Sequence, residues 1–357
     1  MERRAFLKST AVAAAFPWRT VLASSDWRAY EVTTRVEILK PQGVTRVWLP
    51  LPLVEDTPWQ RTYGNQWAGN AARAQIIPDG KYGATMLYAE WSAGTPNPVL
   101  ELTSRFATRD HAVDLSRPRS AAERLTAAER KFFTAPTEFI PTDGIVRETA
   151  RGVIKGARTD VEKARAIYEW VVENTFRDPK VRGCGWGDIK SMLETRNFGG
   201  KCGDLNAMFV GLARSVGVPA RDVYGLRVAR SAHGYASLGV GSPNVTRAQH
   251  CRAEFFAQGY GWVPVDPADV RKVVLEEPPG QLAIGDPKVV AARKRLFGSW
   301  EMNWLAYNMG HDIKLPHSTG PALPYLMYPN GEAGGTRLDQ LDPDAFKYAI
   351  SARPATI

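Results

Sequence analysis

The predicted architecture depends on the segment GGKCGDLNAMFVGLARSVG, which spans residues 199–217. Apolar side chains recur along it, from Leu205 to Val216, at spacings of mostly three and four, the pattern of a helix with one buried face. Two glycines precede the pattern, and Gly217 occupies the position of a C-terminal cap. The segment therefore predicts a helix over residues 202–216, with Cys202 in its first turn.

The placement of Cys202 favours a reactive thiol. The positive end of the helix dipole and the neighbouring Lys201 both favour a thiolate. Free N–H groups in a first turn can also bind a developing oxyanion, which makes Gly203 and Asp204 candidate residues of the oxyanion site or the pocket. Asp204 and Asn206 could instead order this loop or act as ordinary cap and surface residues. Considered alone, Cys202 is equally well interpreted as a structural cysteine.

Two strand-like runs downstream supply partners for this thiol. His250 opens the first run, and Asp266 ends the second. If the runs form a hairpin around residues 258–261, His250 and Asp266 become neighbours, as a general base and the residue that orients it must be. Asp269 is the rival carboxylate. Either residue alone is better interpreted as a surface histidine or a turn-forming aspartate, so the prediction depends on the combination.

The remaining cysteines are Cys184 and Cys251, which with Cys202 give an odd count. Alternation along a strand predicts that Cys251 points away from the face used by His250, so it is a poor candidate nucleophile. A bridge between Cys184 and Cys251 is one possibility, and two buried free thiols are the favoured one. No C-x-x-C pair is present and the five histidines lack ligand spacing, so neither a metal site nor a cofactor is expected.

The flanking regions predict further units. Residues 26–110 alternate apolar and polar side chains between turn signals, which predicts a small β-sandwich. Residues 111–142 are interpreted as a linker, residues 143–270 as the catalytic domain and residues 271–357 as a C-terminal extension packing on the core. Within that extension, four aromatic residues are spaced as one face of a helix: Phe297, Trp300, Trp304 and Tyr307.

Residues 1–25 are interpreted as a signal peptide of the twin-arginine type. Arg3-Arg4 precede Phe6-Leu7-Lys8, a weakly apolar run and a small-residue cleavage site. We therefore expect export by the twin-arginine machinery into the periplasm. No other segment approaches the roughly 18 apolar residues of a membrane span. The net charge of +9 is scattered along the chain, so nucleic acid is not an expected partner.

Four short motifs resemble a known family in order and spacing. They are Gly199–Asp204, Gly217–Arg221, His250 to Glu254, and Gly261–Pro267, and they resemble the core of the transglutaminase-like superfamily. That superfamily includes animal transglutaminases, peptide N-glycanases and bacterial proteins regarded as cysteine proteases or amidases. The resemblance covers about residues 144–270.

The resemblance implies an α+β fold with a papain-like core, in which the cysteine helix packs on an antiparallel sheet that carries the histidine and the aspartate. It also implies that Cys202 is the nucleophile, His250 the base and Asp266 the orienting residue. The chain departs from the family pattern at Cys251-Arg252, where small and aromatic residues are usual. The second oxyanion donor of the family has no obvious match, and Trp186 is the candidate for it.

The predicted function is acyl transfer on an amide bond of a peptide or small amide. Hydrolysis by a peptidase or amidase is favoured, because no residues indicate the second, amine-selective site that transamidation needs. The alternatives are a protein-crosslinking transglutaminase and a non-catalytic envelope binding module that retains the fold.

Overall fold

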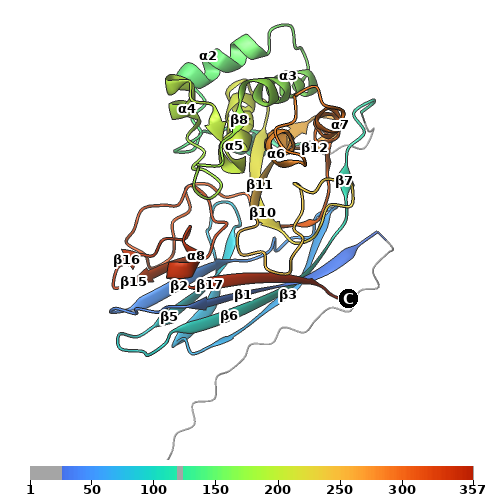
Figure 1. Ribbon diagram of the computed structural model, residues 1–357. Helices are drawn as coiled ribbons and strands as arrows, with labels where there is room; N and C mark the ends of the chain where they lie inside the picture. Colours follow the sequence, from blue (N-terminus) through green and yellow to red (C-terminus); the bar gives the residue numbers. More distant parts are fainter. Residues whose placement is uncertain (1–25, 119–123, 357) are drawn as a thin grey trace, which may run out of the picture.

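The computed structural model describes residues 26–118 and 124–356. The predicted export signal at residues 1–25 lies outside the described residues. Figure 1 shows two stacked parts, with a pair of β-sheets on one side and a four-stranded sheet covered by helices on the other. Strands and helices mix in the second part, so the α+β class predicted from the sequence is confirmed.

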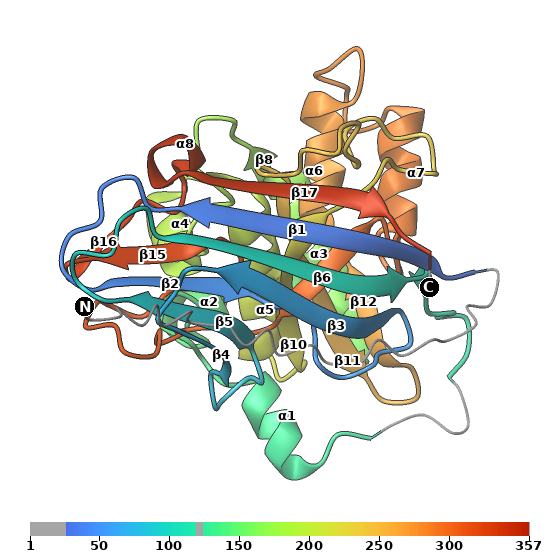
Figure 2. The same ribbon diagram turned by 90° about the horizontal axis from the view of Figure 1, so that it is seen from below.

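The β-sandwich contains two antiparallel sheets, ordered β17-β1-β6-β3 and β16-β15-β2-β5-β4. Figure 2 shows the first of these sheets in front of the second. Alternation explains the packing, since Tyr30, Val32 and Val36 of one strand all turn into the core. The bounds are β1 (Arg28–Glu37), β2 (Thr45–Pro50), β3 (Gln60–Gly69), β4 (Arg73–Pro78), β5 (Thr85–Trp91), β6 (Val99–Thr108), β15 (Asn330–Ala333), β16 (Thr336–Arg337) and β17 (Tyr348–Pro354).

The C-terminal region differs from the extension predicted to pack on the core. Strand β17 pairs with β1 along Tyr348–Pro354, and β15 pairs with β2, so both sheets of the sandwich are completed by residues more than two hundred positions downstream. Without β17, strand β1 would be an open edge, which proteins usually cover. The predicted linker also contains structure, namely β7 (His111–Ala112) and α1 (Ala127–Phe133).

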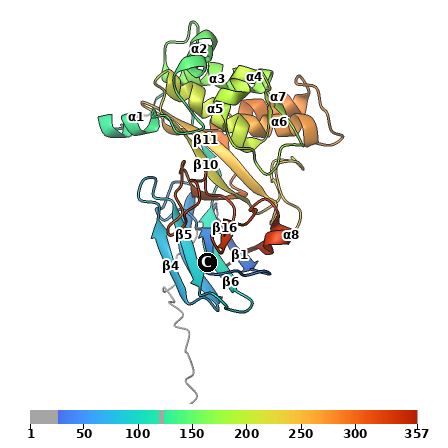
Figure 3. The ribbon, with the colours of Figure 1, turned by 90° about the vertical axis from the view of Figure 1, so that its left-hand side faces the viewer.

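The core sheet has the order β12-β11-β10-β14, and the helices lie over it, as Figure 3 shows from the side. Helix α5 packs on β10 and β11, and nearly all its residues are buried. Thr159 forms a capping box with Glu162 at the start of α3. The bounds are β10 (Ala220–Arg227), β11 (Gln249–Ala257), β12 (Gly261–Val265), β14 (Trp304–Asn308), α2 (Gly144–Val153), α3 (Asp160–Asn174), α4 (Ile189–Thr195), α5 (Cys202–Ser215), α6 (Pro267–Glu276) and α7 (Pro287–Arg295).

Short elements complete the fold: β8 (Phe176–Arg177), β9 (Gly199–Gly200), β13 (Ser299–Trp300) and α8 (Pro343–Phe346). Within the described residues, no helix has the length and apolarity to cross a membrane.

The aromatic stripe predicted to be helical is extended instead. Trp300 lies in β13 opposite His111, while Trp304 and Tyr307 lie in β14 beside β10. Every residue of β14 is buried, so its apolar spacing reflects burial on both faces of a strand. Spacings of three and four therefore did not distinguish a helix from a doubly buried strand here.

Candidate active site

Cys202 is the first residue of α5, and the loop of residues 183–187 is bound to that first turn. The Gly203 N–H donates to the Cys184 carbonyl at 2.7 Å. The Asp204 carboxylate accepts from the Gly187 N–H and the Lys201 N–H, each at 2.9 Å. A side chain at Gly203 would place its Cβ 2.7 Å from the Cys184 carbonyl oxygen, so this contact requires glycine. These bonds fix the position of the Cys202 side chain.

His250 and Asp266 are brought together by the predicted hairpin, in which Ala253 of β11 faces Val265 of β12. His250 Nε2 lies 2.7 Å from Asp266 Oδ2. The other carboxylate oxygen accepts from the Asp269 N–H at 3.0 Å, because Asp266 caps the N-terminus of α6. The backbone of α6 therefore holds the carboxylate, and His250 Nδ1 is left for the thiol.

Asn206 joins the helix of the thiol to both partners. Its Nδ2 donates to the Cys251 carbonyl at 2.8 Å and to Asp266 Oδ1 at 3.3 Å. Its Oδ1 accepts from the Ala268 N–H at 3.4 Å. The side chain is fully buried, so α5, β11 and α6 are held in register by one amide.

Asp269, the rival carboxylate, has a different partner. Arg227 Nη2 lies 2.5 Å and 2.7 Å from its two oxygens, whereas His250 Nε2 lies 3.4 Å away. Burial acts to raise the pKa of Asp269, but the Arg227 charge outweighs it and holds that pKa well below its usual range. Asp269 is therefore the counterion of Arg227 as well as a second negative neighbour of His250.

The charges around His250 favour the imidazolium. Burial and the Arg227 charge act to lower its pKa, but Asp269 and Asp266 together raise it to about 9. The pKa of Cys202 is lowered well below its usual value, by hydrogen bonding from the Cys184 and Cys251 thiols and by His250, against the effect of burial. A thiolate beside an imidazolium is the ground state that a cysteine nucleophile needs.

Arg252, one of the residues that depart from the family pattern, completes the charge balance. Its Nε lies 3.7 Å from Asp266 Oδ2, and its guanidinium stacks 4.7 Å from the ring of Trp304. Burial lowers the pKa of Arg252 to about 10. Arg227, Arg252 and protonated His250 thus oppose Asp266, Asp269 and the Cys202 thiolate. The sequence marked Arg252 only as a departure from the family pattern and did not mark Arg227, although a charged residue within a buried strand run was the available signal for both.

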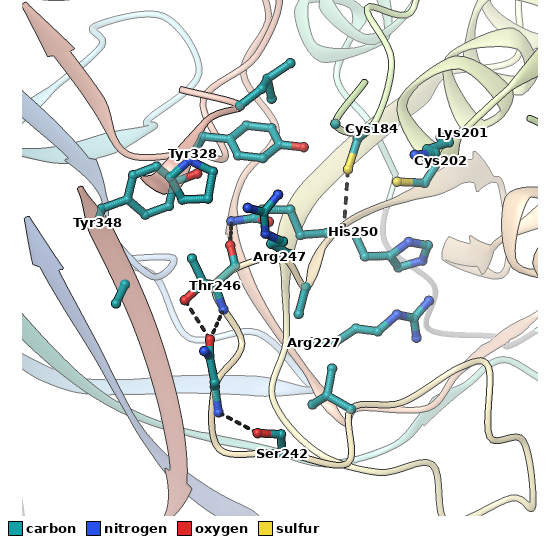
Figure 4. Close-up of a pocket in the computed structure, with 18 of the residues that line it drawn as sticks. Cys184, Lys201, Cys202, Arg227, Ser242, Thr246, Arg247, His250, Tyr328 and Tyr348 are labelled. Atoms are coloured by element: carbon teal, nitrogen blue, oxygen red, sulfur yellow. Dashed lines mark hydrogen bonds between the residues drawn. The ribbon is translucent and has the colours of Figure 1, made fainter. Parts of the chain in front are cut away.

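The thiol opens on a pocket of about 840 Å³ between the core and the sandwich, shown in Figure 4. From the core it is lined by Lys201, Cys202 and His250, with Arg227 below the imidazole. Strands β1 and β17 supply the opposite wall, which includes Tyr348. The sandwich therefore forms part of the cavity that a substrate would enter.

Of the residues predicted for the oxyanion site, Trp186 lies away from Cys202, whereas Gly203 and Asp204 lie in the first turn of α5. Trp186 is 61% exposed, stands beside Phe139, and lines a separate small cavity. The Gly203 N–H is already bonded to Cys184, and Asp204 orders the loop, with burial raising its pKa to about 6. Among the described residues, no hydrogen bond takes up the backbone N–H of Cys202. That N–H is the oxyanion donor that the geometry leaves available.

All three cysteines are buried free thiols, and their sulfur atoms lie within 4.8 Å of one another. The expectation that Cys251 lies away from the site is wrong, because its sulfur lies within 4.8 Å of that of Cys202; that Cys251 is a poor candidate nucleophile stays a prediction. Strand alternation fixes the direction of a side chain, but α5 lies across β11 so that Cys202 reaches Cys251 as well as His250.

Among the described residues, two groups have the spacing to hold a metal ion: the three cysteines, and the set His250, Asp266 and Asp269. The second group already has Arg227 at 2.5 Å and Arg252 at 3.7 Å from its carboxylates. Those guanidinium charges neutralise the carboxylates, so this group does not favour a cation.

Comparisons with known proteins agree with this geometry. Residues 147–267 match the sequence profile of the transglutaminase-like superfamily. An uncharacterised protein of Haemophilus influenzae is 35% identical over 344 residues, which is 91% of each chain.

Similar solved structures include a Cytophaga hutchinsonii protein described as a proposed cysteine protease, at 11% identity and a TM-score of 0.56, covering 93% of this chain and 92% of the other. The periplasmic domain of TgpA from Pseudomonas aeruginosa is matched at 14% identity and a TM-score of 0.32, covering 66% of this chain and 90% of that domain. The first of these shows that the fold is shared along nearly the whole chain. With the matched profile, the shared fold and the cysteine beside a bonded histidine and aspartate, the chain belongs to the transglutaminase-like superfamily.

Proposed function

We propose that this protein hydrolyses amide bonds by thiol-dependent acyl transfer, as a peptidase or amidase, with Cys202, His250 and Asp266 as its triad. The observation that carries the proposal is the position of Cys202. It begins a buried helix and opens on the 840 Å³ pocket, while His250 is bonded to Asp266 at 2.7 Å.

The mechanism follows from the atoms available. The Cys202 thiolate attacks the amide carbonyl, and the oxyanion forms at the N–H of Cys202, where the helix dipole also favours negative charge. His250 protonates the leaving amine from Nδ1, so the amine departs and a thioester remains. Water then loses a proton to His250 and attacks the thioester, which releases the acid and restores the thiolate. Asp266 keeps the imidazole in one orientation throughout.

Hydrolysis is proposed over transamidation because the described pocket offers one cavity at the thiol and its near wall is cationic. Lys201 lies beside Cys202 in that wall, and Arg227, whose charge Asp269 already balances, adds no acidic group there. A protonated amine acceptor would be repelled there, whereas water would not.

We also propose that the enzyme acts outside the cytoplasm, in the periplasm, on peptides or small amides. The support is the Arg3-Arg4 pattern with its following apolar run in the sequence. Fusing residues 1–25 to a reporter that is active only after twin-arginine export tests this part separately. An Arg3→Lys/Arg4→Lys double variant should abolish reporter export.

The test of the reaction is a library of peptide and small amides, assayed for released amine with the reduced full chain. Substrates that turn over should acylate Cys202, detected as a mass increase on its peptide after acid quenching. Adding a labelled primary amine distinguishes the alternatives. Free acid as the main product supports a hydrolase, whereas stoichiometric incorporation of the amine overturns it in favour of a transglutaminase. Cys202 that is alkylated no faster than a free cysteine in a denatured chain would indicate a binding module.

A further inference from the structure

Two of the three clustered thiols, those of Cys184 and Cys251, form and break no bond in the proposed amide hydrolysis. Cys184 and Cys251 are buried, their sulfur atoms lie within 4.8 Å of that of Cys202, and the mechanism uses neither. We propose that Cys184 is a resolving cysteine, which forms a reversible disulfide with Cys202 after a hydroperoxide has oxidised Cys202 to a sulfenic acid. This inference rests on the reactive thiolate of the proposed function, although it needs no amide substrate.

The backbone around Cys184 supports this pairing. Its carbonyl accepts the Gly203 N–H at 2.7 Å, so the chain at Cys184 lies directly against the residue that follows Cys202. A disulfide needs Cα atoms within about 7 Å, and this backbone bond holds the two chains at close range. Tyr325 OH donates to the Gly185 carbonyl at 2.6 Å, which anchors the next residue of the same loop.

Access distinguishes Cys184 from Cys251. Cys184 and Cys202 both line the 840 Å³ pocket, so a small peroxide or thiol in that pocket meets both sulfur atoms. Cys251 is 0% exposed in the middle of the core sheet, between β10 and β12. Its carbonyl is held by Asn206 at 2.8 Å.

The ability to move also favours Cys184. Two sulfur atoms must approach to about 2.05 Å in a disulfide, so one of them has to shift. Cys184 lies in a turn between Gly183 and Gly185, outside any strand or helix, and its thiol meets the Gln249 carbonyl at 3.5 Å as well as the neighbouring thiols. Cys251 lies in a strand paired on both sides, where a shift would disturb the ladder.

The chemistry balances in two steps. The Cys202 thiolate attacks one peroxide oxygen, so an S–O bond forms, the O–O bond breaks, and the second oxygen leaves as water or an alcohol after gaining a proton. Cys184 then attacks the sulfenic sulfur, so an S–S bond forms, the S–O bond breaks, and hydroxide leaves as water with the proton of Cys184. Two thiols are oxidised and one peroxide is reduced. A dithiol then reduces the disulfide by exchange, which restores both thiols and leaves the dithiol oxidised to a disulfide.

The consequence is protection of the nucleophile. A sulfenic acid left in the pocket can be oxidised further to a sulfinic acid, which thiols cannot reduce. A disulfide with Cys184 stops that path and blocks acyl transfer until a reductant arrives.

The first experiment uses the reduced full chain and a few equivalents of hydrogen peroxide. We expect free thiols, counted after denaturation, to fall from three to one, and peptide mapping to find Cys184 joined to Cys202. Dithiothreitol should restore all three and the rate of Cys202 alkylation. A Cys202–Cys251 bridge in the map, or a sulfenic acid that persists and is trapped by dimedone, overturns the proposal.

Matched variants sharpen the result. In Cys184→Ser, peroxide should convert Cys202 to a sulfinic acid, with most of the alkylation rate lost and not regained with dithiothreitol. In Cys251→Ser, the disulfide and its recovery should persist. Full recovery in Cys184→Ser, or none in Cys251→Ser, contradicts the assignment. If Cys184→Ser fails to fold, the map of the unmodified chain decides alone.

The outcomes also separate this proposal from the hydrolase. A Cys184–Cys202 disulfide in a chain that turns over no amide leaves the resolving role standing and removes the hydrolase. Amide turnover in a chain that forms no such disulfide does the reverse.

Discussion

Within the part of the chain that the structure describes, the core contains two buried pairs of a histidine and an aspartate, and one of them has the properties of a catalytic pair. His250 lies 2.7 Å from Asp266 and is within reach of a thiol. His311 lies 3.4 Å from Asp222, outside hydrogen-bond geometry, and its other ring nitrogen meets the Tyr224 hydroxyl at 3.3 Å. Both aspartates are 0% exposed, so burial alone does not distinguish them.

Their electrostatics are opposite. Carboxylates raise the pKa of His250 to about 9, whereas burial lowers that of His311 well below its usual value. The carboxylate oxygens of Asp222 have no hydrogen-bond partner among the described residues, and burial raises the pKa of Asp222 to about 7. Burial and Asp269 raise the pKa of Asp266 too, but His250 and Arg252 act against that rise, and its carboxylate accepts from the backbone of α6.

The difference shows what makes a histidine–carboxylate pair reactive. The pair needs a nucleophile within reach of the imidazole. It also needs neighbouring charges that allow the imidazolium and the carboxylate to stay charged side by side. The pair at His250 has both, while the pair at His311 is a nearly neutral packing contact. Substitutions and pH changes at the two pairs test that difference.

Cys202→Ala should abolish amide turnover, with a loss on the order of 10⁶-fold as for other triad nucleophiles. The fold should survive, because alanine fits the first turn of α5 and the substitution removes no backbone hydrogen bond. Turnover and thermal melting of the variant measure both effects. Retained turnover or outright unfolding would show that Cys202 is not the nucleophile.

Asp266→Asn should lower the turnover rate by about 10²–10⁴-fold, since neutralising a triad aspartate removes the control of the imidazole orientation. The matched control is Asp269→Asn, which leaves buried Arg227 without its counterion. That change should mainly lower stability, by about 3–5 kcal/mol. Comparing kcat with urea unfolding for both variants separates the roles. A mild Asp266→Asn beside a catalytically crippled Asp269→Asn would reverse the assignment.

The pH dependence should reveal the imidazolium. Turnover should fall about tenfold per pH unit above about 9, because His250 then lacks the proton for the leaving amine. The alkylation rate of Cys202 needs only the thiolate, so it should show no such alkaline fall. A parallel decline of both rates above pH 9 would mean that the shared cause is unfolding or a different group.

Stability should follow the same group. The folded pKa of His250, about 9, exceeds the unfolded value of 6.5. Its contribution is therefore fully present below pH 6.5 and is lost as the pH rises through about 9. Melting temperatures between pH 6 and pH 10 measure this loss, and His250→Gln should flatten the slope.

Asp222→Asn should have the smallest effect on catalysis and a favourable one on stability. The folded pKa of Asp222 is raised from 3.8 to about 7, so the native state holds a proton that the unfolded chain releases, and stability falls as the pH rises between those values. The amide of the Asp222→Asn variant stays neutral at every pH, so the variant does not lose this stability as the pH rises. We expect a higher melting temperature than the unmodified chain at pH 8, little difference at pH 4, and turnover close to normal. A severe loss of turnover would place this pair in the catalytic machinery.

Local chemistry made much of the core predictable. The helix from Cys202 was visible because the apolar period, the flanking glycines and the cap agree over one segment. The hairpin was visible because two apolar runs surround a glycine-rich turn. The extended conformation of the stripe containing Trp300 and Trp304 was not predictable. Both faces of β14 are buried, so the spacing of its apolar residues does not distinguish a helix from a strand.

The superfamily, the α+β class and the order of the cysteine, the histidine and the aspartate could be inferred from the chain's local motifs, because each depends on a few adjacent residues. The pairing of β17 with the N-terminal sheet, and the place of this sheet as one wall of the pocket, became visible in three dimensions. The tertiary structure also placed Arg227 on Asp269 and gathered Cys184 and Cys251 around Cys202. These contacts join residues tens to hundreds of positions apart, and their energies come from burial and charge in three dimensions, which no local pattern encodes.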